Sequence, residues 1–521
     1  QTGEERQWRA ERVDTAGPCP TCHGHRLRAE ALAVRFLERG IADYGAWSVK
    51  QASTFFQALT LADREAAIAD DVVAEIRSRL GFLEAVGLGY LTLDRGAPTL
   101  SGGEAQRIRL AAQLGSNLQG VCYILDEPTI GLHARDNRML LDTLGALEAK
   151  GNTMVVVEHD EDTIRRAGHV IDLGPGAGVA GGRIVAEGPL GELLENPDSV
   201  TGRALAQPLI HPLRGQRRDP HAVDAIDVHG VRAHNLDAVD ARFPLSRLIG
   251  VSGVSGSGKS TLVRDVLHGS LAPRLGRRGD PDAPTRGCRS ISGWETLNRV
   301  LEVDQTPIGK TPRSCPATYV GIYDEIRQLF AQTEEARIRG YGPGRFSFNT
   351  REGRCPECEG QGMRRVEMNF LPDVTVPCER CQGQRFTPET LAVTWKGRSI
   401  GDVLNMEIEH AVDFFAAHTR LHHTLALLRD TGLGSLTLGQ PSPTLSGGEA
   451  QRVKLVSELA KARPERGGPS AARTLYILDE PTVGLHVADV ERLIEVLHRL
   501  VDAGHSVVVI EHNLDIFAEA D

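Results

Sequence analysis

The chain has 521 residues, 40% of them apolar and 25% charged, and carries a net charge of −10 at pH 7. This length allows roughly three or four domains with their own cores, and no stretch reaches the ~18 consecutive apolar residues of a membrane-spanning helix. The negative charge excludes a global attraction to nucleic acid, so such a contact would need a local basic surface. Because residues 1–30 lack a signal-peptide pattern, we expect a cytoplasmic protein with no membrane partner.

Six of the nine cysteines fall in Cys-x-x-Cys pairs, which begin at Cys19, Cys355 and Cys378. In a cytosolic chain such pairs favour a metal over a disulfide. The later two pairs predict a closed, structural Zn²⁺ site with four thiolate ligands, Cys355, Cys358, Cys378 and Cys381. Cys19 and Cys22 are then half of a truncated second site. Cys122 leads into an apolar strand and is expected in the core, while Cys288 and Cys315 have no evident role.

Further along the chain, a Ser-Gly-Gly triplet within Thr99–Arg107 opens a predicted helix rich in Arg and Leu. Its N-terminus can bind an anion without any lysine, although a simple helix cap is the alternative. The apolar run that follows predicts a strand ending on two acids, Asp126 and Glu127. His159 comes after the next apolar strand.

The same pattern returns in the second half of the chain. Thr444–Arg452 repeats the Ser-Gly-Gly stretch, and Asp479, Glu480 and His512 repeat the acids and the histidine. The offset changes from 345 to 353 residues between these motifs, and the added residues fall in a polar segment at 463–469 that is expected to be an exposed loop.

A phosphate loop, Gly253-Val-Ser-Gly-Ser-Gly-Lys-Ser260, accompanies the second copy alone. Its glycines let backbone N–H groups face a phosphate at a helix N-terminus, with Lys259 on the β- and γ-phosphates and Ser260 on Mg²⁺. A chance Gly-Ser loop is the alternative. Asp479 suits Mg²⁺ coordination and Glu480 suits polarising the attacking water. Gln305 is a further contact to metal and water, and His512 a donor to the γ-phosphate.

The cysteine pair at Cys19 aligns with that at Cys378, so residue 1 lies opposite about residue 360 of the second copy. The first copy thus lacks its own phosphate loop. We therefore expect a fragment of a symmetric, duplicated protein, with little or no ATP cycling of its own.

These motifs together resemble the ATP-binding-cassette (ABC) ATPases, in which the signature of one half closes over nucleotide held by the other. The resemblance implies an α/β fold with P-loop NTPase sheets and flanking helices, helical signature domains and a four-cysteine zinc module. It implies a composite site for ATP and Mg²⁺ made of Gly253, Val254, Ser255, Gly256, Ser257, Gly258, Lys259, Ser260, Thr261, Gln305, Asp479, Glu480 and His512, closed by Ser101, Gly102, Gly103 and Glu104. The partner site would use Ser446, Gly447, Gly448, Glu449, Asp126, Glu127 and His159.

Further segments narrow the resemblance to the UvrA family of the bacterial excinuclease: Val303–Arg313, Pro316–Tyr319, Gly344–Asn349 and Gly439–Pro441, together with the zinc knuckles. This implies an ATP-dependent DNA-damage recognition subunit of the nucleotide excision repair excinuclease. Such a protein binds distorted or lesion-containing double-stranded DNA as a homodimer, hydrolyses ATP and loads the next repair factor, a UvrB-like protein whose binding domain is outside this chain. Lys310, Arg313 and Arg345 are the candidate DNA contacts, with Arg364 and Arg365 weaker ones; solvated charges are the alternative.

The resemblance also divides the chain into six parts. They are the remainder of signature domain I (1–115), the C-terminal part of ATP-binding lobe I (116–213), a linker (214–222), the N-terminal part of lobe II (223–300), signature domain II with the zinc module at 355–381 (301–455), and the truncated C-terminal part of lobe II (456–521).

Two other functions fit parts of the pattern. A UvrA-like paralogue for DNA-directed drug resistance or tolerance would carry the same motifs. A transporter-type ABC ATPase would need a membrane partner, and the zinc insert and the two halves in one chain argue against it.

Overall fold

The computed structural model describes residue 19 and residues 21–22, 24–100, 102–114, 119–129, 131–132, 134–176, 181–207, 217–221, 223–254, 256–275, 279–366, 374–461 and 473–521. Ser101, Ser255 and part of the predicted linker lie outside these residues. The chain divides into two units, the first made of residues 1–158 and 254–256 and the second of 159–253 and 257–521. Among the described residues no helix combines the length and the apolar character required to cross a lipid bilayer.

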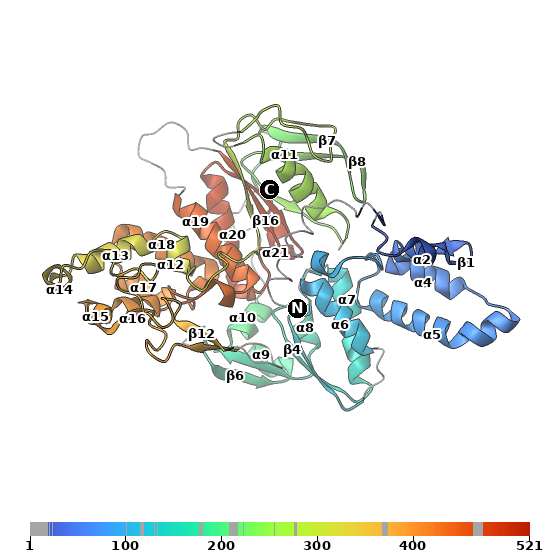
Figure 1. The fold of residues 1–521 in the computed structure, drawn as a ribbon, viewed down its shortest axis with the longest axis horizontal. Coiled ribbons are helices and arrows are strands. Elements are labelled where there is room, and N and C mark those ends of the chain that lie inside the picture. Colours follow the sequence, from blue (N-terminus) through green and yellow to red (C-terminus); the bar gives the residue numbers. More distant parts are fainter. Residues whose placement is uncertain are drawn as a thin grey trace. The chain divides into compact units, whose positions relative to one another are not determined.

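The first unit is mainly helical, with one two-stranded parallel sheet and one short hairpin (Figure 1). Its elements are α2 (Ala29–Ala33), β1 (Arg35–Phe36), β2 (Arg39–Gly40), α3 (Ile41–Gly45), α4 (Val49–Ala58), α5 (Asp63–Ala85), η1 (Ala97–Thr99), α6 (Gly102–Leu114), β3 (Cys122–Asp126), α7 (Ala134–Glu148) and β4 (Thr153–Val157). The end of α5 and the inner faces of α6 and α7 share one apolar core, against which Leu125 of β3 and Met154 of β4 pack.

The second unit begins with a small α/β segment and continues into the strands of a central parallel sheet. The first segment holds α8 (Glu161–Arg166), β5 (Val170–Gly174), β6 (Arg183–Gly188), α9 (Leu190–Glu195) and α10 (Val200–Ala206). An antiparallel sheet and the first central strands follow, with β7 (Ala225–Ala233), β8 (Leu236–Pro244), β9 (Leu248–Val251), the helix η3 (Thr261–His268), α11 (Gly269–Leu271), β10 (Ser290–Ser292) and β11 (Arg299–Val303).

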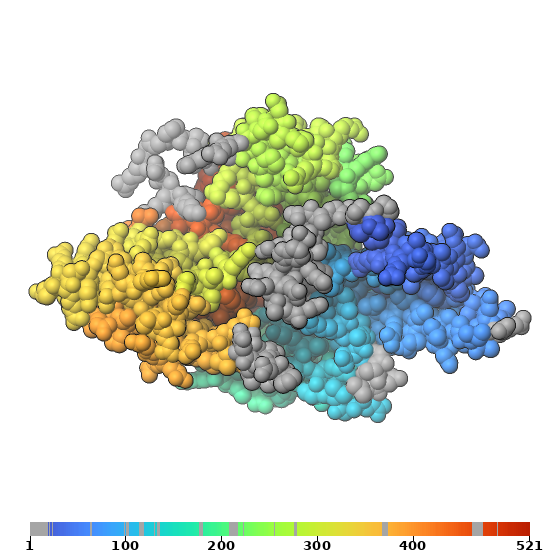
Figure 2. Space-filling view, in the orientation of Figure 1, coloured from blue at the N-terminus to red at the C-terminus, as the bar shows by residue number. Residues whose placement is uncertain are grey.

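A helical insert then interrupts the central sheet and forms the yellow and orange body in Figure 2. It contains α12 (Pro316–Tyr319), α13 (Tyr323–Ala331), α14 (Glu334–Ile338), β12 (Met363–Val366), β13 (Val374–Pro377), α15 (Pro388–Leu391), β14 (Thr394–Trp395), β15 (Arg398–Ser399), α16 (Ile400–Leu404), α17 (Ile408–Phe414), α18 (Thr419–Leu428), η4 (Arg429–Leu433) and η5 (Ser442–Thr444). Its core includes Phe330, Phe346 and Phe348, all fully buried, and also takes in Val453 and Val456 of α19 (Gly447–Lys461).

The central sheet is completed after the insert by β16 (Thr474–Asp479), α20 (Val487–Asp502), β17 (Ser506–Ile510) and α21 (Leu514–Glu519). Its four strands are parallel in the order β11-β16-β17-β9. Because successive side chains of a strand face opposite sides, Tyr476 and Leu478 pack with α20, whereas Leu475 and Ile477 pack with η3 and β7. Burial on both faces explains why these strands are almost continuously apolar.

The equivalent sheet of the first unit is covered on one side only. Ile124 and Val155 are 76% and 47% exposed, whereas their counterparts Ile477 and Val508 are fully buried. Cys122 lies on the same exposed face, so the prediction that it belongs to the core is wrong. The reason is that the strand lacks, in the described residues, the elements that cover β16 in the second unit.

The fold class predicted from the sequence is confirmed. Parallel strands carry the acidic motifs, helices begin at Gly102 and Gly447 of the two signature segments, and a four-cysteine cluster lies in the helical insert. The six-part domain division stays a prediction.

Candidate nucleotide site and four-cysteine centre

Four chain segments leave the central sheet of the second unit at the same edge. Since all four strands are parallel, their carboxyl ends coincide, and β9 continues into the phosphate loop while β11 continues to Gln305. In the same way β16 ends on Asp479 followed by Glu480, and β17 is followed by His512. This is the edge at which open α/β sheets bind ligands.

The described part of the phosphate loop has a backbone that requires glycine. Gly253 and Gly258 have φ of 149° and 101°, values that L side chains rarely adopt. A Cβ atom on Gly253 would lie 2.7 Å from Ser257 Oγ, and one on Gly258 would lie 2.8 Å from a methyl of Leu236. Lys259 Nζ donates to the Gly253 carbonyl at 2.8 Å, which folds the lysine over the loop. The loop is therefore compact and presents Ser260 at the start of η3.

Glu480 has a left-handed backbone, with φ of 47°. A non-glycine residue in this region carries strain of about 1–3 kcal/mol, which must be balanced by its surroundings. The Glu480 N–H donates to the Ile510 carbonyl at 2.8 Å, and Gln305 Nε2 lies 3.5 Å from the Glu480 carbonyl oxygen. His512 Nε2 lies 3.8 Å from Glu480 Oε1. The residues predicted to handle the attacking water thus lie together, on three neighbouring strand ends.

Glu511 supports this group, and it was missed in the sequence. Its fully buried carboxylate accepts hydrogen bonds from Thr482 N at 2.8 Å, Thr482 Oγ1 at 2.5 Å, His512 N at 2.7 Å and Asn513 N at 3.1 Å. Burial raises the pKa of Glu511, and these donors oppose that effect. The Glu511 carboxylate therefore holds two backbone segments in place, the one after Glu480 and the one after β17. The repeated Glu-His pair at 158–159 and 511–512 was the available signal.

Asp479 lies against a cation on the helix after the phosphate loop. Arg264 Nη1 is 3.1 Å from Asp479 Oδ2, and the same guanidinium contacts the Glu302 carboxylate through Nε. Burial raises the pKa of Asp479, and the charge and hydrogen bond of Arg264 lower it. The predicted Mg²⁺ ligand is thus already engaged by an arginine.

The second Ser-Gly-Gly segment forms a capping box at the start of α19. Ser446 N donates to Glu449 Oε2 at 2.7 Å, and Glu449 N donates to Ser446 Oγ at 3.2 Å. A Cβ on Gly448 would lie 2.6 Å from the Val483 carbonyl oxygen, so only glycine fits there. Further along α19, Gln451 Nε2 donates to the carbonyls of Val303 and Asp479 at 2.8 and 2.9 Å. The buried Gln451 amide thus links helix α19 to the ends of strands β11 and β16.

The first unit holds the matching acids. Asp126 ends β3, and its carbonyl accepts a hydrogen bond from Gln106 Nε2 at 2.8 Å, as the Asp479 carbonyl does from Gln451. Glu127 has φ of 44° and donates from its N–H to Val157 at 2.8 Å. Glu104 is 7% exposed and accepts a hydrogen bond from Tyr90 at 2.7 Å. The two copies therefore share their local backbone geometry.

His159 lies in the second unit, beside the segment that follows Glu480. Its ring is edge-on to that of His486, with centroids 6.4 Å apart. His486 Nε2 is 3.1 Å from Thr201 Oγ1, which also donates to Asp172 at 2.7 Å. Burial lowers the pKa of His486. Polar contacts thus connect His486 to the strand β5, and His159 lies against the ring of His486.

The four cysteines of the helical insert form one buried cluster. Their sulfur atoms all lie within 4.8 Å of one another, and Cys358 and Cys381 are 3.6 Å apart. Four ligands at ~2.3 Å around a tetrahedral Zn²⁺ would have sulfurs about 3.8 Å apart, so the spacing fits a metal and is far longer than a disulfide. Gly362 N donates to Cys358 Sγ at 3.3 Å, a typical feature of a thiolate ligand's surroundings. The cluster could hold a metal ion. Cys19 and Cys22 lie in the first unit and are more exposed.

The candidate DNA contacts differ in how free they are. Lys310 is exposed. Arg313 donates to the carbonyl and the carboxylate of Glu359 at 3.1 and 3.2 Å. Arg345 donates to Thr390 at 2.9 Å and stacks over the Tyr341 ring at 4.6 Å. The arginines therefore also have structural contacts.

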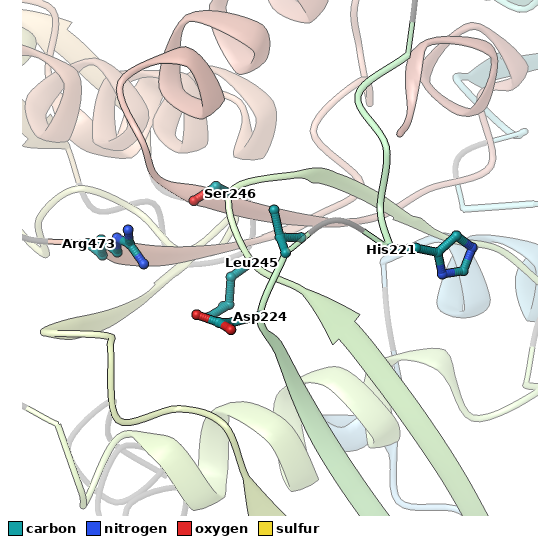
Figure 3. A pocket seen from close by; sticks show the side chains of 6 residues that line it. His221, Asp224, Leu245, Ser246 and Arg473 are labelled. Carbon is teal, nitrogen blue, oxygen red and sulfur yellow. The ribbon is translucent and has the colours of Figure 1, made fainter.

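A depression of about 480 Å³ lies at the other edge of the central sheet (Figure 3). It is lined by His221, Val223, Asp224, Leu245, Ser246 and Arg473, which precede or join the amino ends of β7, β9 and β16. It includes none of the residues that the motifs predicted.

Parallel strands that deliver a phosphate loop and an Asp-Glu pair to one edge, beside a Ser-Gly-Gly helix, define the architecture of an ABC-class ATPase. The chain is 55% identical over 506 residues to the UvrABC system protein A of Thermus thermophilus and 54% identical over 503 residues to that of Bacillus subtilis. These alignments cover 97% and 96% of the chain, and 52% and 51% of the two relatives. The crystal structure of UvrA2 from Deinococcus radiodurans superposes with a TM-score of 0.87 at 45% identity, covering 96% of this chain and 61% of that one.

A search of family profiles finds no match. The chain nevertheless belongs to the family of UvrABC system protein A, and it spans about half the length of the curated relatives it matches.

Proposed function

We propose that the protein is the ATP-dependent DNA-damage recognition subunit of a nucleotide excision repair excinuclease. The observation that carries this proposal is 52–55% identity to proteins named UvrABC system protein A, over at least 96% of the chain. In this role the protein binds distorted double-stranded DNA as a homodimer in the cytoplasm and hands it to a UvrB-like partner.

ATP and Mg²⁺ would bind at the carboxyl edge of the central sheet. The loop Gly253–Ser260 would hold the phosphates through its N–H groups and Lys259, while Ser260 and Asp479 would ligate Mg²⁺. Glu480 would accept a proton from the attacking water, and Gln305 and His512 would orient that water and the γ-phosphate. The contacts among Glu480, Gln305 and His512 support this division of roles.

The first signature segment, Ser101–Glu104, would close this site, and the second, Ser446–Glu449, would close a partner site with Asp126, Glu127 and His159. The equal left-handed backbone of Glu127 and Glu480 supports two sites of one design. ATP binding would then close the two halves, and hydrolysis would reopen them.

The metal of the insert would be Zn²⁺, held by Cys355, Cys358, Cys378 and Cys381. Four thiolates leave no open position, so the ion would be structural. It would stabilise the base of the hairpin formed by β12 and β13, since Cys378 N donates to the Gly362 carbonyl at 2.9 Å.

DNA would be read mainly through its deformability, because a damage sensor must accept many sequences. Lys310 would contact a phosphate directly. Arg313 and Arg345 would act partly by holding the surface in shape.

The test is equilibrium binding of two duplexes of one sequence, one carrying a single bulky lesion, in the absence and presence of Mg²⁺-ATP. Fluorescence anisotropy at fixed salt should show tighter binding of the damaged duplex and a change of that preference with ATP. Equal affinity for both duplexes under every condition would contradict the proposal.

A further inference from the structure

Arg264 lies on η3, five residues after Lys259, and stands between two acidic strand ends. Its Nη1 is 3.1 Å from Asp479 Oδ2, at the end of β16, and its Nε contacts the carboxylate of Glu302 on β11. The side chain of Arg264 is 40% exposed, whereas those of Asp479 and Glu302 are 21% and 20% exposed. The arginine thus bridges two half-buried carboxylates that otherwise repel each other.

Two other groups complete the surroundings of this bridge. His268 Nδ1, one turn along η3, is 3.6 Å from the second oxygen of Glu302. Asp304 adds negative charge near Arg264, although Lys454 pairs with it. Of these groups, only Asp479 is assigned to Mg²⁺ in the proposed site.

A bound Mg²⁺ and the Arg264 guanidinium would compete for the same carboxylate. Mg²⁺ requires oxygen ligands in near-octahedral positions at ~2.1 Å. The Asp479 carboxylate would therefore have to bind the ion, or one of the water molecules that surround the ion, in a defined position. The Arg264 guanidinium, at hydrogen-bond distance from Asp479, would repel the positively charged ion and occupies one oxygen of the Asp479 carboxylate. Glu302 offers the arginine a second partner when it leaves Asp479.

We propose that Arg264 competes with Mg²⁺ for Asp479 and so sets the Mg²⁺ concentration at which nucleotide binds, with Glu302 as its alternative partner. This inference rests on the proposed ATP site. Arg264 is a positioning residue, because it would act on the metal through Asp479.

The experiment is a Mg²⁺ titration of nucleotide binding to the purified chain, followed by the fluorescence of a mant-ATP probe. Binding of Mn²⁺ measured by electron paramagnetic resonance gives a second readout independent of turnover. Arg264→Gln should lower the Mg²⁺ midpoint roughly three- to tenfold, the effect expected for the loss of a charged pair of this exposure. Glu302→Gln should raise the midpoint, because Arg264 then has Asp479 as its remaining carboxylate partner.

Two further variants separate the pairing from general charge effects. Arg264→Lys keeps the charge but loses the planar fork, so its midpoint should fall between those of the wild type and Arg264→Gln. Arg232→Gln removes an exposed arginine paired with Asp237 on the neighbouring sheet and should leave the midpoint unchanged.

The inference is overturned if Arg264→Gln leaves the midpoint unchanged, or raises it because the arginine holds Asp479 in place for the metal. If Arg264→Gln does not fold, the sign of the Glu302→Gln shift decides in its place. If the wild-type chain binds Mg²⁺-nucleotide and both variants, Arg264→Gln and Glu302→Gln, have the wild-type Mg²⁺ midpoint, this inference is refuted while the proposed ATP site stands. A wild-type chain that binds no nucleotide at any Mg²⁺ concentration refutes the proposed ATP site and this inference with it.

Discussion

Glu127 and Glu480 occupy matching positions in the two copies and adopt the same left-handed backbone, with φ of 44° and 47°. Their N–H groups donate to matching strands, at Val157 and Ile510, over the same distance of 2.8 Å. The same unfavourable backbone conformation occurs in both copies. It determines the direction of the glutamate carboxylate, because a helical or extended backbone at this position would point the side chain elsewhere.

Glu480 gives a prediction that separates strain from chemistry. In the full-length protein, both Glu480→Gln and Glu480→Gly should leave ATP bound but unhydrolysed, because neither residue offers a carboxylate to accept the proton of the water. The glycine variant should in addition be as stable as the wild type or more stable, by up to about 1 kcal/mol, since glycine adopts this φ without strain. The ATP:ADP ratio of bound nucleotide over time and a denaturant titration provide the two measurements. Normal hydrolysis by the glutamine variant would remove Glu480 from its assigned role.

The four-cysteine cluster predicts a metal-dependent insert. Cys378→Ser should abolish stoichiometric zinc in elemental analysis and increase proteolysis around residues 350–390, because a structural metal contributes folding energy directly. Cys122→Ser, at an exposed cysteine outside the cluster, is the matched control and should keep the zinc. Full zinc content in the Cys378→Ser protein would argue against this ligand set.

The two glutamines of the signature helices predict unequal losses of stability. Gln451 is 1% exposed and donates to two carbonyls, so Gln451→Ala should cost about 2–3 kcal/mol in the free energy of unfolding of its unit. Gln106 makes one such bond at a more exposed position, and Gln106→Ala should cost about 1 kcal/mol or less. Hydrogen exchange that resolves the two units would measure both. Equal losses would mean that the buried amide contributes no more than the exposed one.

The uncovered face of the first sheet predicts a contrast between matching valines. Val508 is fully buried, so Val508→Thr should destabilise its unit by about 1–3 kcal/mol. Val155 is 47% exposed, and Val155→Thr should change stability by less than about 0.5 kcal/mol while reducing the binding of a hydrophobic dye. Chemical denaturation and dye fluorescence test the pair. A large loss from Val155→Thr would show that this face is covered in solution.

Lys310 predicts an effect on DNA that does not depend on the lesion. Lys310→Ala should weaken binding of damaged and intact duplexes alike and reduce the slope of log affinity against log salt by about one. Arg345→Ala should also lower the melting temperature, because its guanidinium packs on Tyr341 and bonds Thr390. A Lys310→Ala protein with an unchanged salt slope would exclude a phosphate contact at this residue.

Much of the fold and of the candidate site could be predicted from the motifs, because each motif determines the structure of its own short segment. A glycine loop before Lys259 or an acid pair at a strand end specifies its own backbone, and parallel strands then bring Gln305, Glu480 and His512 to one edge. Pairings between distant segments are not written in any one motif. The bond of Arg264 to Asp479 spans 215 residues, and the buried carboxylate of Glu511 reaches Thr482 across 29.

Cys122 is a residue for which the sequence predicted burial and the structure shows exposure. Its strand has the same apolar pattern as β16, so the sequence predicted a core position. Whether a strand residue is buried depends on what covers that face, and the described residues leave this one exposed. Composition and periodicity therefore predicted the strand but not its environment.

ATP bound at this phosphate loop should change how the protein discriminates damaged from intact DNA. The most direct measurement is the ratio of affinities for damaged and intact duplex, with and without Mg²⁺-ATP, in the wild type and in Lys259→Ala. We predict that ATP changes this ratio in the wild type and has no effect in Lys259→Ala, which should still bind DNA. An ATP response of equal size in both proteins, or a ratio of one throughout, would contradict the account.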